Sequence, residues 1–279
     1  MHSCCGAHHS HHSSLYDTLR SSRTNLVQTY LGSSKDYRVI VPNEAEIEAC
    51  NTLGKRCVIH SKLVTNLAIH NCVTLHVVEK ELIVANQLQD STVVMHIGNL
   101  KQEGSIDTLT NNINSLRHLL PYHNKKLCLE IAAGKGNDIG WNEEQLHKIW
   151  EALDRNIVGL CFDTQHGFAS GMTPLQRTED IDYTMNLFYN NTGQLPTVIH
   201  LNDSKVPSGS RKDVHAAIGS GYIWPRYNSE SYFGATNLGL VRLKQYSERY
   251  NIPVISESPE PLQDVMLWDS IAYVVAGNR

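Results

Sequence analysis

The stretch GLCFD, residues 159–163, is an apolar run that ends in a carboxylate, and it is the pattern that decides the fold. Short apolar runs bounded by polar residues are typical of strands that are buried on both faces of a parallel sheet. Seven other β-rich runs of similar length occur along the chain. The eight predicted strands cover residues 3–7, 25–31, 56–60, 92–96, 126–130, 159–163, 196–200 and 253–257.

Segments with helical periodicity separate these runs, and three of them start with recognisable capping residues. Asn43 precedes one helical segment, Asn142 precedes another, and Asp180 precedes a third. Alternating strands and helices predict a parallel sheet with right-handed crossovers. Eight units fit a closed barrel better than an open sheet. We therefore expect an α/β protein, a (β/α)8 TIM barrel with its functional site at the C-terminal face of the strands.

The spacing of the strand ends supports this prediction. From His60 to His200, successive ends lie 33 to 37 residues apart, close to the length of one strand and helix in such a barrel. The last gap, from His200 to Glu257, is 57 residues and predicts an insertion that carries an aromatic loop at residues 222–233. No linker rich in Pro, Gly or Ser divides the chain, so we expect residues 1–279 to form a single domain.

The composition excludes several classes of protein. The chain has 279 residues, 24 Lys and Arg against 28 Asp and Glu, and 41% hydrophobic residues, unlike a disordered chain or a strongly basic nucleic-acid clamp. No apolar stretch reaches the roughly 20 residues of a membrane helix, and the first residues lack the pattern of a signal peptide. Seven Cys without a CxxC pair do not form a disulfide framework. We therefore expect an intracellular monomer, cytoplasmic or nuclear.

Six consecutive predicted strands, the third to the eighth, end in a His, Asp or Glu side chain. The C-terminal ends of barrel strands meet on one face, where the following loops build the active site. Two local pairs add to the set, because Asp163 and His166 are three residues apart and Asp213 and His215 are two apart. A lone His is usually a core or capping residue, but six such strand ends in a row indicate one shared site. The nine candidate metal ligands are His60, His96, Glu130, Asp163, His166, His200, Asp213, His215 and Glu257.

Nine nitrogen and oxygen ligands exceed the needs of one ion, so the sequence predicts two or three ions. Imidazole and carboxylate suit Zn2+, with Mn2+ or Fe2+ as substitutes. Clustered ions of this kind are typical of enzymes that cleave phosphoesters. Three divalent ions add six positive charges and change the formal charge from -4 to +2, so the mild acidity of the chain does not exclude a DNA substrate.

Three segments around these residues resemble the signature blocks of a known family. They are residues 158–166 (VGLCFDTQH), 199–215 (IHLNDSKVPSGSRKDVH) and 129–136 (LEIAAGKG). The family is that of endonuclease IV, also called AP endonuclease family 2, whose members are trinuclear zinc apurinic/apyrimidinic endonucleases. The resemblance extends from residue 6 to residue 257, nearly the whole chain.

The resemblance implies an activity and a role for each candidate ligand. The family hydrolyses the phosphodiester 5′ to abasic sites in duplex DNA through a zinc-bound hydroxide, leaves a 3′-hydroxyl and removes 3′-blocking groups. By similarity, Glu130 bridges two of three Zn2+ ions and Glu257 orients the nucleophile, so both are expected to be catalytic. The three implied sites are His60, His96 and Glu130; Glu130, Asp163, His200 and Glu257; and His166, Asp213 and His215.

The same resemblance, with the basic residues beside the ligands, implies a set of DNA contacts. Chain segments after the first, second, third and seventh strands carry them. The expected contacts are His8, Lys35, Tyr37, Arg38, Lys62, Leu63, Asn66, Lys205, Arg211 and Lys212.

Four positions depart from the family pattern, one of them Ile97, which stands where Pro is common after His96. Gln165 replaces a Cys, Val214 replaces an Arg or His, and Leu63 replaces an aromatic residue. None of these changes removes a ligand, so the chemistry is expected to be retained while the contacts to DNA differ. The departures indicate a divergent member of the family.

Two other functions compete with this interpretation. A sugar isomerase or epimerase of the xylose isomerase-like barrel class shares the barrel and a metal at the strand ends, but it uses one or two ions, bound mostly by carboxylates. That function leaves His166, Asp213 and His215 unexplained. A non-catalytic DNA-binding module is the second alternative, and the presence of all nine ligands argues against it.

Overall fold

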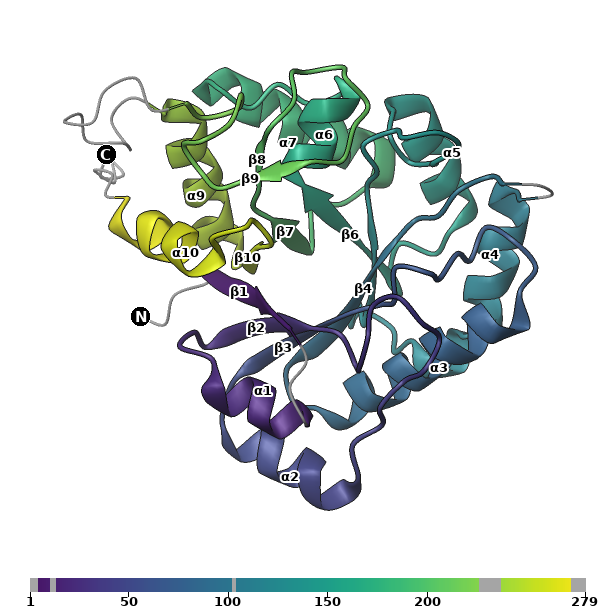
Figure 1. Ribbon diagram of the computed structural model, residues 1–279. Helices are drawn as coiled ribbons and strands as arrows, with labels where there is room; N and C mark the ends of the chain where they lie inside the picture. Colours follow the sequence, from purple (N-terminus) through teal and green to yellow (C-terminus); the bar gives the residue numbers. More distant parts are fainter. Residues whose placement is uncertain (1–4, 11–13, 102–103, 226–236, 272–279) are drawn as a thin grey trace.

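The computed structural model describes residues 5–10, 14–101, 104–225 and 237–271. Eight parallel strands form a closed barrel in the order β1, β10, β7, β6, β5, β4, β3, β2 (Figure 1). The expected TIM barrel is therefore confirmed. The strands are β1 (Cys5–His9), β2 (Leu26–Thr29), β3 (Arg56–His60), β4 (Ser91–His96), β5 (Leu127–Glu130), β6 (Val158–Asp163), β7 (Val198–His200) and β10 (Val254–Ser256).

The observed strand bounds agree closely with the predicted ones, except in the first strand. That strand was expected to end at Ala7, but it continues to His9 because His8 and His9 pair with Gln28 and Thr29 of β2. Residues 3 and 4 of the predicted strand lie outside the described residues. The extra length carries His8 to the same end of the barrel as the other polar strand ends.

The helices lie on the outside of the barrel (Figure 1). Asn43 and Asn142 cap α2 and α5 as predicted, each side chain accepting a backbone N–H. The predicted start at Asp180 is wrong, because α7 begins at Thr178 and Asp180 instead accepts the backbone N–H of Arg177 at 2.9 Å from inside the first turn. Elements outside the barrel are α1 (Leu15–Ser21), α2 (Glu44–Thr52), α3 (Cys72–Gln87), α4 (Ile106–Ser115), η1 (Arg117–Leu119), α5 (Glu143–Ala152), α6 (Thr164–Ser170), α7 (Thr178–Thr192), α9 (Leu238–Tyr250) and α10 (Pro261–Ser270).

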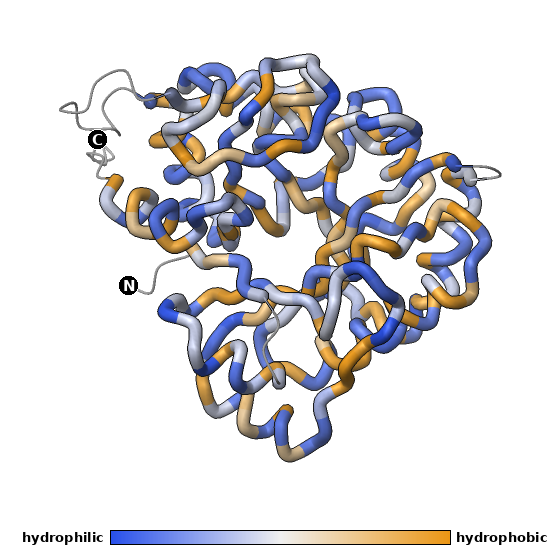
Figure 2. The backbone as a smooth tube through the Cα atoms, viewed as in Figure 1, coloured by the Kyte–Doolittle hydropathy of each residue, from blue (hydrophilic) through white to orange (hydrophobic). Residues whose placement is uncertain are grey.

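Apolar residues form two separate layers. The larger layer lies between the barrel and the helices, and hydrophobic and hydrophilic residues accordingly alternate along the helices in Figure 2. The smaller layer fills the barrel itself with one residue from each of seven strands: Leu26, Val58, Val94, Cys128, Cys161, Val198 and Ile255. A filled interior of this kind leaves a barrel open to ligands only at its ends. Among the described residues, no helix is both long and apolar enough to cross a membrane.

The predicted insertion lies between β7 and β10. It contains a short antiparallel pair, β8 (Asp203–Ser204) and β9 (His215–Ala216), beside α6. Trp224 is fully buried and its indole N–H donates to the carbonyl of Leu175 at 3.0 Å, so this part of the aromatic loop packs on the barrel. Residues 226–236, with the rest of the aromatic loop, lie outside the described part of the chain.

Candidate metal centre

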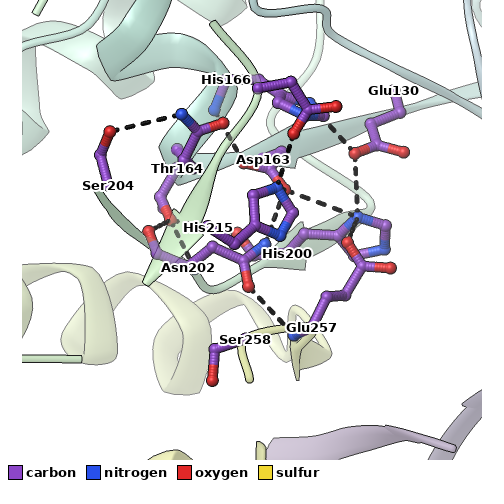
Figure 3. Close-up of polar contacts among 12 residues, drawn as sticks. Glu130, Asp163, Thr164, His166, His200, Asn202, Ser204, His215, Glu257 and Ser258 are labelled. Atoms are coloured by element: carbon purple, nitrogen blue, oxygen red, sulfur yellow. Dashed lines mark hydrogen bonds and ion pairs between the residues drawn. The ribbon is translucent and has the colours of Figure 1, made fainter. Parts of the chain in front are cut away.

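Strand register places the polar strand ends at the same level. His96 pairs with Glu130 across β4 and β5, and Asp163 pairs with His200 across β6 and β7. Glu257 follows directly after β10. Figure 3 shows the side chains of Glu130, Asp163, His166, His200, His215 and Glu257 pointing toward one another.

Glu130 lies at the centre of the cluster and is almost fully buried. Its Oε1 is 3.1 Å from His200 Nδ1 and 3.3 Å from His166 Nδ1. Its Oε2 is 3.3 Å from His60 Nε2 and 3.8 Å from His96 Nε2. Each oxygen therefore faces a different pair of imidazole rings, the arrangement expected of a carboxylate that bridges two cations.

A second group of ligand atoms surrounds His200. Its Nδ1 faces Glu257 Oε2 at 3.0 Å and Asp163 Oδ2 at 4.0 Å, in addition to Glu130. Glu130, Asp163, His200 and Glu257 each offer one ligand atom, and these four atoms lie within 4.8 Å of one another. One nitrogen is thus enclosed by three carboxylates.

The two local pairs predicted from the sequence meet in a third group. Asp163 caps α6 by accepting the backbone N–H of His166 at 2.8 Å, which turns the His166 ring back over the strand end. Asp213 Oδ1 is 3.3 Å from His166 Nε2 and 3.3 Å from His215 Nε2. Residues from β6, α6, the β8–β9 connection and β9 therefore converge, although Asp213 and His215 are about fifty residues downstream of Asp163 and His166.

The electrostatics of the cluster favour charged forms. Burial alone would raise the pKa of Glu130, but His200 and His96 beside it hold that pKa well below its usual range. Burial likewise opposes the charged form of His166, but Asp163 and hydrogen bonds to Asp213 and Glu130 hold its pKa well above the ordinary value. Burial lowers the pKa of His96, so the charged form is not favoured at every imidazole of the cluster. A divalent cation that binds such a site competes with the protons on its ligands.

Two buried atoms fit the presence of cations. Within the described part of the chain, Glu130 Oε2 and His215 Nε2 make no hydrogen bond. Each of these atoms nevertheless faces another candidate ligand, since Glu130 Oε2 is 3.3 Å from His60 Nε2 and His215 Nε2 is 3.3 Å from Asp213 Oδ1. Ligand atoms that face one another without a well-formed hydrogen bond are suited to a cation between them. Cys161 lies near Glu130 and His200, but burial raises the pKa of its thiol far above the ordinary value, which keeps it a neutral core residue.

Two residues of the site escaped prediction because neither is a His, Asp or Glu. Tyr30 lies with its ring 5.0 Å from that of His8 and 5.1 Å from that of His60. Asn202 donates to Asp163 Oδ2 at 2.7 Å and accepts the backbone N–H of Glu257 at 3.0 Å. Tyr30 directly follows β2 and Asn202 lies two residues beyond β7, and these positions at strand ends are the signal that could have identified them.

A cavity of about 260 Å³ opens above the cluster. Two of the predicted DNA contacts, His8 and Leu63, lie in its wall, and Leu63 is 52% exposed. Burial lowers the pKa of His8 to about 4, so its ring is neutral at physiological pH. The full lining is His8, Tyr30, His60, Leu63, His96, Glu130, His166, Asp213, His215 and Glu257.

Six further predicted DNA contacts are exposed on the loops around this cavity. Tyr37 is anchored by a hydrogen bond from its hydroxyl to the carbonyl of Val64 at 3.2 Å, which joins the loops after β2 and β3. Arg211 stacks on the Trp141 ring at 4.1 Å and donates to the carbonyl of Gly134 at 2.7 Å. The six exposed residues are Lys35, Tyr37, Arg38, Lys205, Arg211 and Lys212.

The structure does not place the side chains of Lys62 and Asn66, the other two predicted DNA contacts, at the surface of the cavity. Lys62 is 1% exposed, and its ammonium donates to the carbonyls of Leu31 at 2.6 Å and Ser33 at 2.7 Å. Asn66 is also buried and donates to the carbonyl of Asn99 at 2.9 Å. Both side chains tie neighbouring loops together and do not face the cavity.

Replacing Lys62 by Met is expected to destabilise the protein by about 1–3 kcal/mol, because two buried carbonyls lose their charged donor. Chemical denaturation measures this free energy of unfolding. Lys205→Met is the control. It removes an exposed lysine that directly follows β8, and it should leave the free energy of unfolding unchanged. Equal stability of the two variants would contradict the assigned role of Lys62.

Comparisons with known proteins extend this picture. Residues 71–230 match the family described as the xylose isomerase-like TIM barrel. The chain is 32% identical over 209 residues to a probable endonuclease 4 of Staphylococcus saprophyticus, an alignment that covers 70% of this chain and 69% of that protein. It is 31% identical over 175 residues to a probable endonuclease 4 of Acholeplasma laidlawii, covering 60% of this chain and 58% of that relative's length.

A solved structure shares the whole fold. The structure of endonuclease IV from Thermus thermophilus superposes with a TM-score of 0.73 and 22% sequence identity, covering 96% of this chain and 99% of that chain. At this level of identity the likeness establishes the barrel. The sequence relatives carry the assignment to a family.

Proposed function

The chain belongs to the endonuclease IV family, and from this premise we propose that it is a DNA repair endonuclease that cleaves duplex DNA 5′ to abasic sites. The observation that carries the proposal is the convergence of nine nitrogen and oxygen ligands around Glu130 at one end of the barrel. The product carries a 3′-hydroxyl, and the same chemistry extends to 3′-blocking groups. The family relationship supports the class of reaction, and the site supports the metal dependence.

Three Zn2+ ions, or Mn2+ or Fe2+ in their place, suit this ligand set. When bound, such ions supply a nucleophile near neutral pH and stabilise the attacking and leaving oxygens. Glu130 would serve both the first and the second site, because its Oε2 faces His60 and its Oε1 faces His200. Asp213 lies between His166 and His215 and completes the third site. The other ligands are His60 and His96 in the first site, and Asp163, His200 and Glu257 in the second.

Glu257 is the residue of the second site best placed to orient the attacking nucleophile. It is 13% exposed and lines the cavity, and its Oε2 lies 3.0 Å from His200 Nδ1. Burial opposes its ionisation, but His200 holds the pKa of Glu257 below its usual range, so the carboxylate stays ionised and can accept a hydrogen bond.

The cavity can receive an abasic nucleotide. Its volume of about 260 Å³ leaves room for a sugar phosphate beside the ligand cluster. Tyr30 and Leu63 form part of its wall. An abasic nucleotide also turns out of the duplex at low cost, because no base pair is lost.

The exposed residues around the cavity suit contact with a duplex. Lys35 and Arg38 lie on the loop after β2, and Lys205, Arg211 and Lys212 lie on the β8–β9 connection. Basic side chains on two sides of the cavity can bind phosphates and fix the position of the DNA without reading its sequence. Tyr37 and Leu63 are also exposed and can fill the gap left in the DNA helix.

A sugar isomerase or epimerase is the alternative with the same barrel. It needs one or two ions held mostly by carboxylates, so it gives no role to His166, Asp213 and His215. Asp213 Oδ1 nevertheless lies 3.3 Å from His166 Nε2 and 3.3 Å from His215 Nε2, and all three residues line the cavity. The third group of ligands therefore favours the endonuclease.

Incision of a duplex with one tetrahydrofuran abasic analogue tests the proposal. We expect a single nick 5′ to the analogue with a 3′-hydroxyl end, because the cavity accepts the baseless sugar and the ligand cluster lies beneath it. An undamaged duplex of the same sequence is the control and should stay intact. The proposal fails if a metal-containing preparation makes no nick at any protein concentration.

A further inference from the structure

Gln28 is a fully buried amide in the wall of the barrel beside the metal centre. It lies on β2, between His8 of β1 and Val58 of β3 in the sheet register. β2 contributes none of the nine candidate ligands. Its contribution to the site is therefore indirect, through the contacts of this amide.

The amide of Gln28 contacts three side chains of the site. Its Nε2 donates to Glu257 Oε1 at 2.5 Å, and its Oε1 lies 2.8 Å from His200 Nε2. Nε2 also lies 3.2 Å from His8 Nδ1. One side chain thus connects two candidate ligands of the second site with a residue of the cavity wall.

The carboxylate of Glu257 fixes the orientation of this amide. An ionised carboxylate only accepts hydrogen bonds, so the amide nitrogen of Gln28 must face it. The amide oxygen then faces His200 Nε2, which must donate. A proton held on Nε2 leaves Nδ1 as the ligand atom of His200, and Nδ1 is the atom that faces Glu130 and Glu257 at 3.1 and 3.0 Å.

The same orientation determines what His8 presents to the substrate. The nitrogen of an amide is a donor and not an acceptor, so His8 Nδ1 accepts from Gln28. A neutral imidazole that accepts at Nδ1 carries its proton on Nε2. His8 therefore offers an N–H donor at the cavity wall, the form that can bind a phosphate oxygen.

We propose that Gln28 is a positioning residue for the second metal site, one that holds the Glu257 carboxylate in place and directs His200 Nδ1 toward the ion. The proposal rests on the proposed function, because it assumes that a divalent ion occupies this site. Hydrogen-bonding partners behind metal ligands commonly change metal affinity about 10–100-fold when they are removed. Gln28 is the partner of two ligands at once.

Titration of the metal-free protein with Zn2+ against a chromophoric chelator tests the role of Gln28. In Gln28→Met, a residue of similar volume that has no N–H to donate, we expect one of the zinc ions to bind about 10–100-fold more weakly while the others keep their affinity. Gln28→Asn retains the amide on a shorter side chain and should fall between wild type and Gln28→Met. Circular dichroism confirms that each variant is folded.

Gln194→Met is the matched control. Gln194 is also a buried amide, and it donates to the carbonyl of Val158 at 3.1 Å, at the start of β6 and away from the metal centre. Its loss should lower stability without changing zinc affinity. Unchanged zinc affinity in Gln28→Met would overturn the role of Gln28 and leave the endonuclease proposal intact, whereas a wild-type protein that binds no zinc would overturn both.

Discussion

Glu130→Gln is expected to abolish incision of the abasic duplex, with turnover reduced at least about a thousandfold, or about 4 kcal/mol in the activation barrier. Glu130 presents Oε1 to His166 and His200 and Oε2 to His60 and His96. An amide has one acceptor oxygen and an NH2 group that cannot bind a cation. The substitution therefore removes one of the two ligand oxygens that the proposed first and second sites share, with almost no change in volume.

DNA binding should be partly retained in Glu130→Gln, because Lys35, Arg38 and Arg211 stay exposed around the cavity. A band-shift assay with the abasic duplex, read beside the incision assay, separates the two effects. Glu144→Gln provides the control, since Glu144 is 76% exposed on α5, where it pairs with Lys148. Full activity of Glu130→Gln would disprove the bridging role.

Removal of metal by a chelator is expected to produce the second large effect, a complete loss of incision together with a lower Tm. The folded chain gathers four carboxylates and five imidazoles that the unfolded chain separates, so ions bind the folded form preferentially. One ion at a hundred times its dissociation constant stabilises the folded state by about 2.7 kcal/mol. Incision and Tm should both recover when Zn2+ or Mn2+ is added back.

Thermal unfolding with and without chelator measures the change in Tm. Glu130→Gln is the matched variant. Because its metal site is damaged, its Tm should differ less between protein with chelator and protein without chelator. Incision that continues in a preparation shown to be free of metal would exclude the proposed mechanism. A Tm that does not respond to chelator would show that no ion stabilises the fold.

The barrel and the ligand cluster were predictable because both follow from local patterns. Apolar runs such as residues 159–163 identify the strands, and barrel closure then brings the strand ends to one level. His96 and Glu130 are 34 residues apart in the sequence, yet they are direct neighbours in the register of β4 and β5. Knowing which residue ends each strand is therefore enough to place most of the site.

Contacts between loops, and the contacts of the buried Gln28 amide, were not predictable in the same way. Lys62 carries a charge, so a sequence interpretation expects it in water, but its ammonium is buried, where it donates to the carbonyls of Leu31 and Ser33. Loss of water around it lowers its pKa. Its partners are about thirty residues away and depend on how two loops fold together. Gln28 belongs to no metal-ligand pattern, and its importance appears only when its three contacts are seen.

The number of metal ions per chain tests the central claim most directly, because the claim is that nine strand-end and loop residues form one multinuclear centre. Elemental analysis of protein purified without chelator, normalised to protein concentration, gives this number. The account predicts a value close to three, mainly zinc, with manganese or iron as substitutes. A value close to one in protein saturated with zinc would contradict it and favour a sugar isomerase or epimerase, and a value of zero would exclude a metal centre altogether.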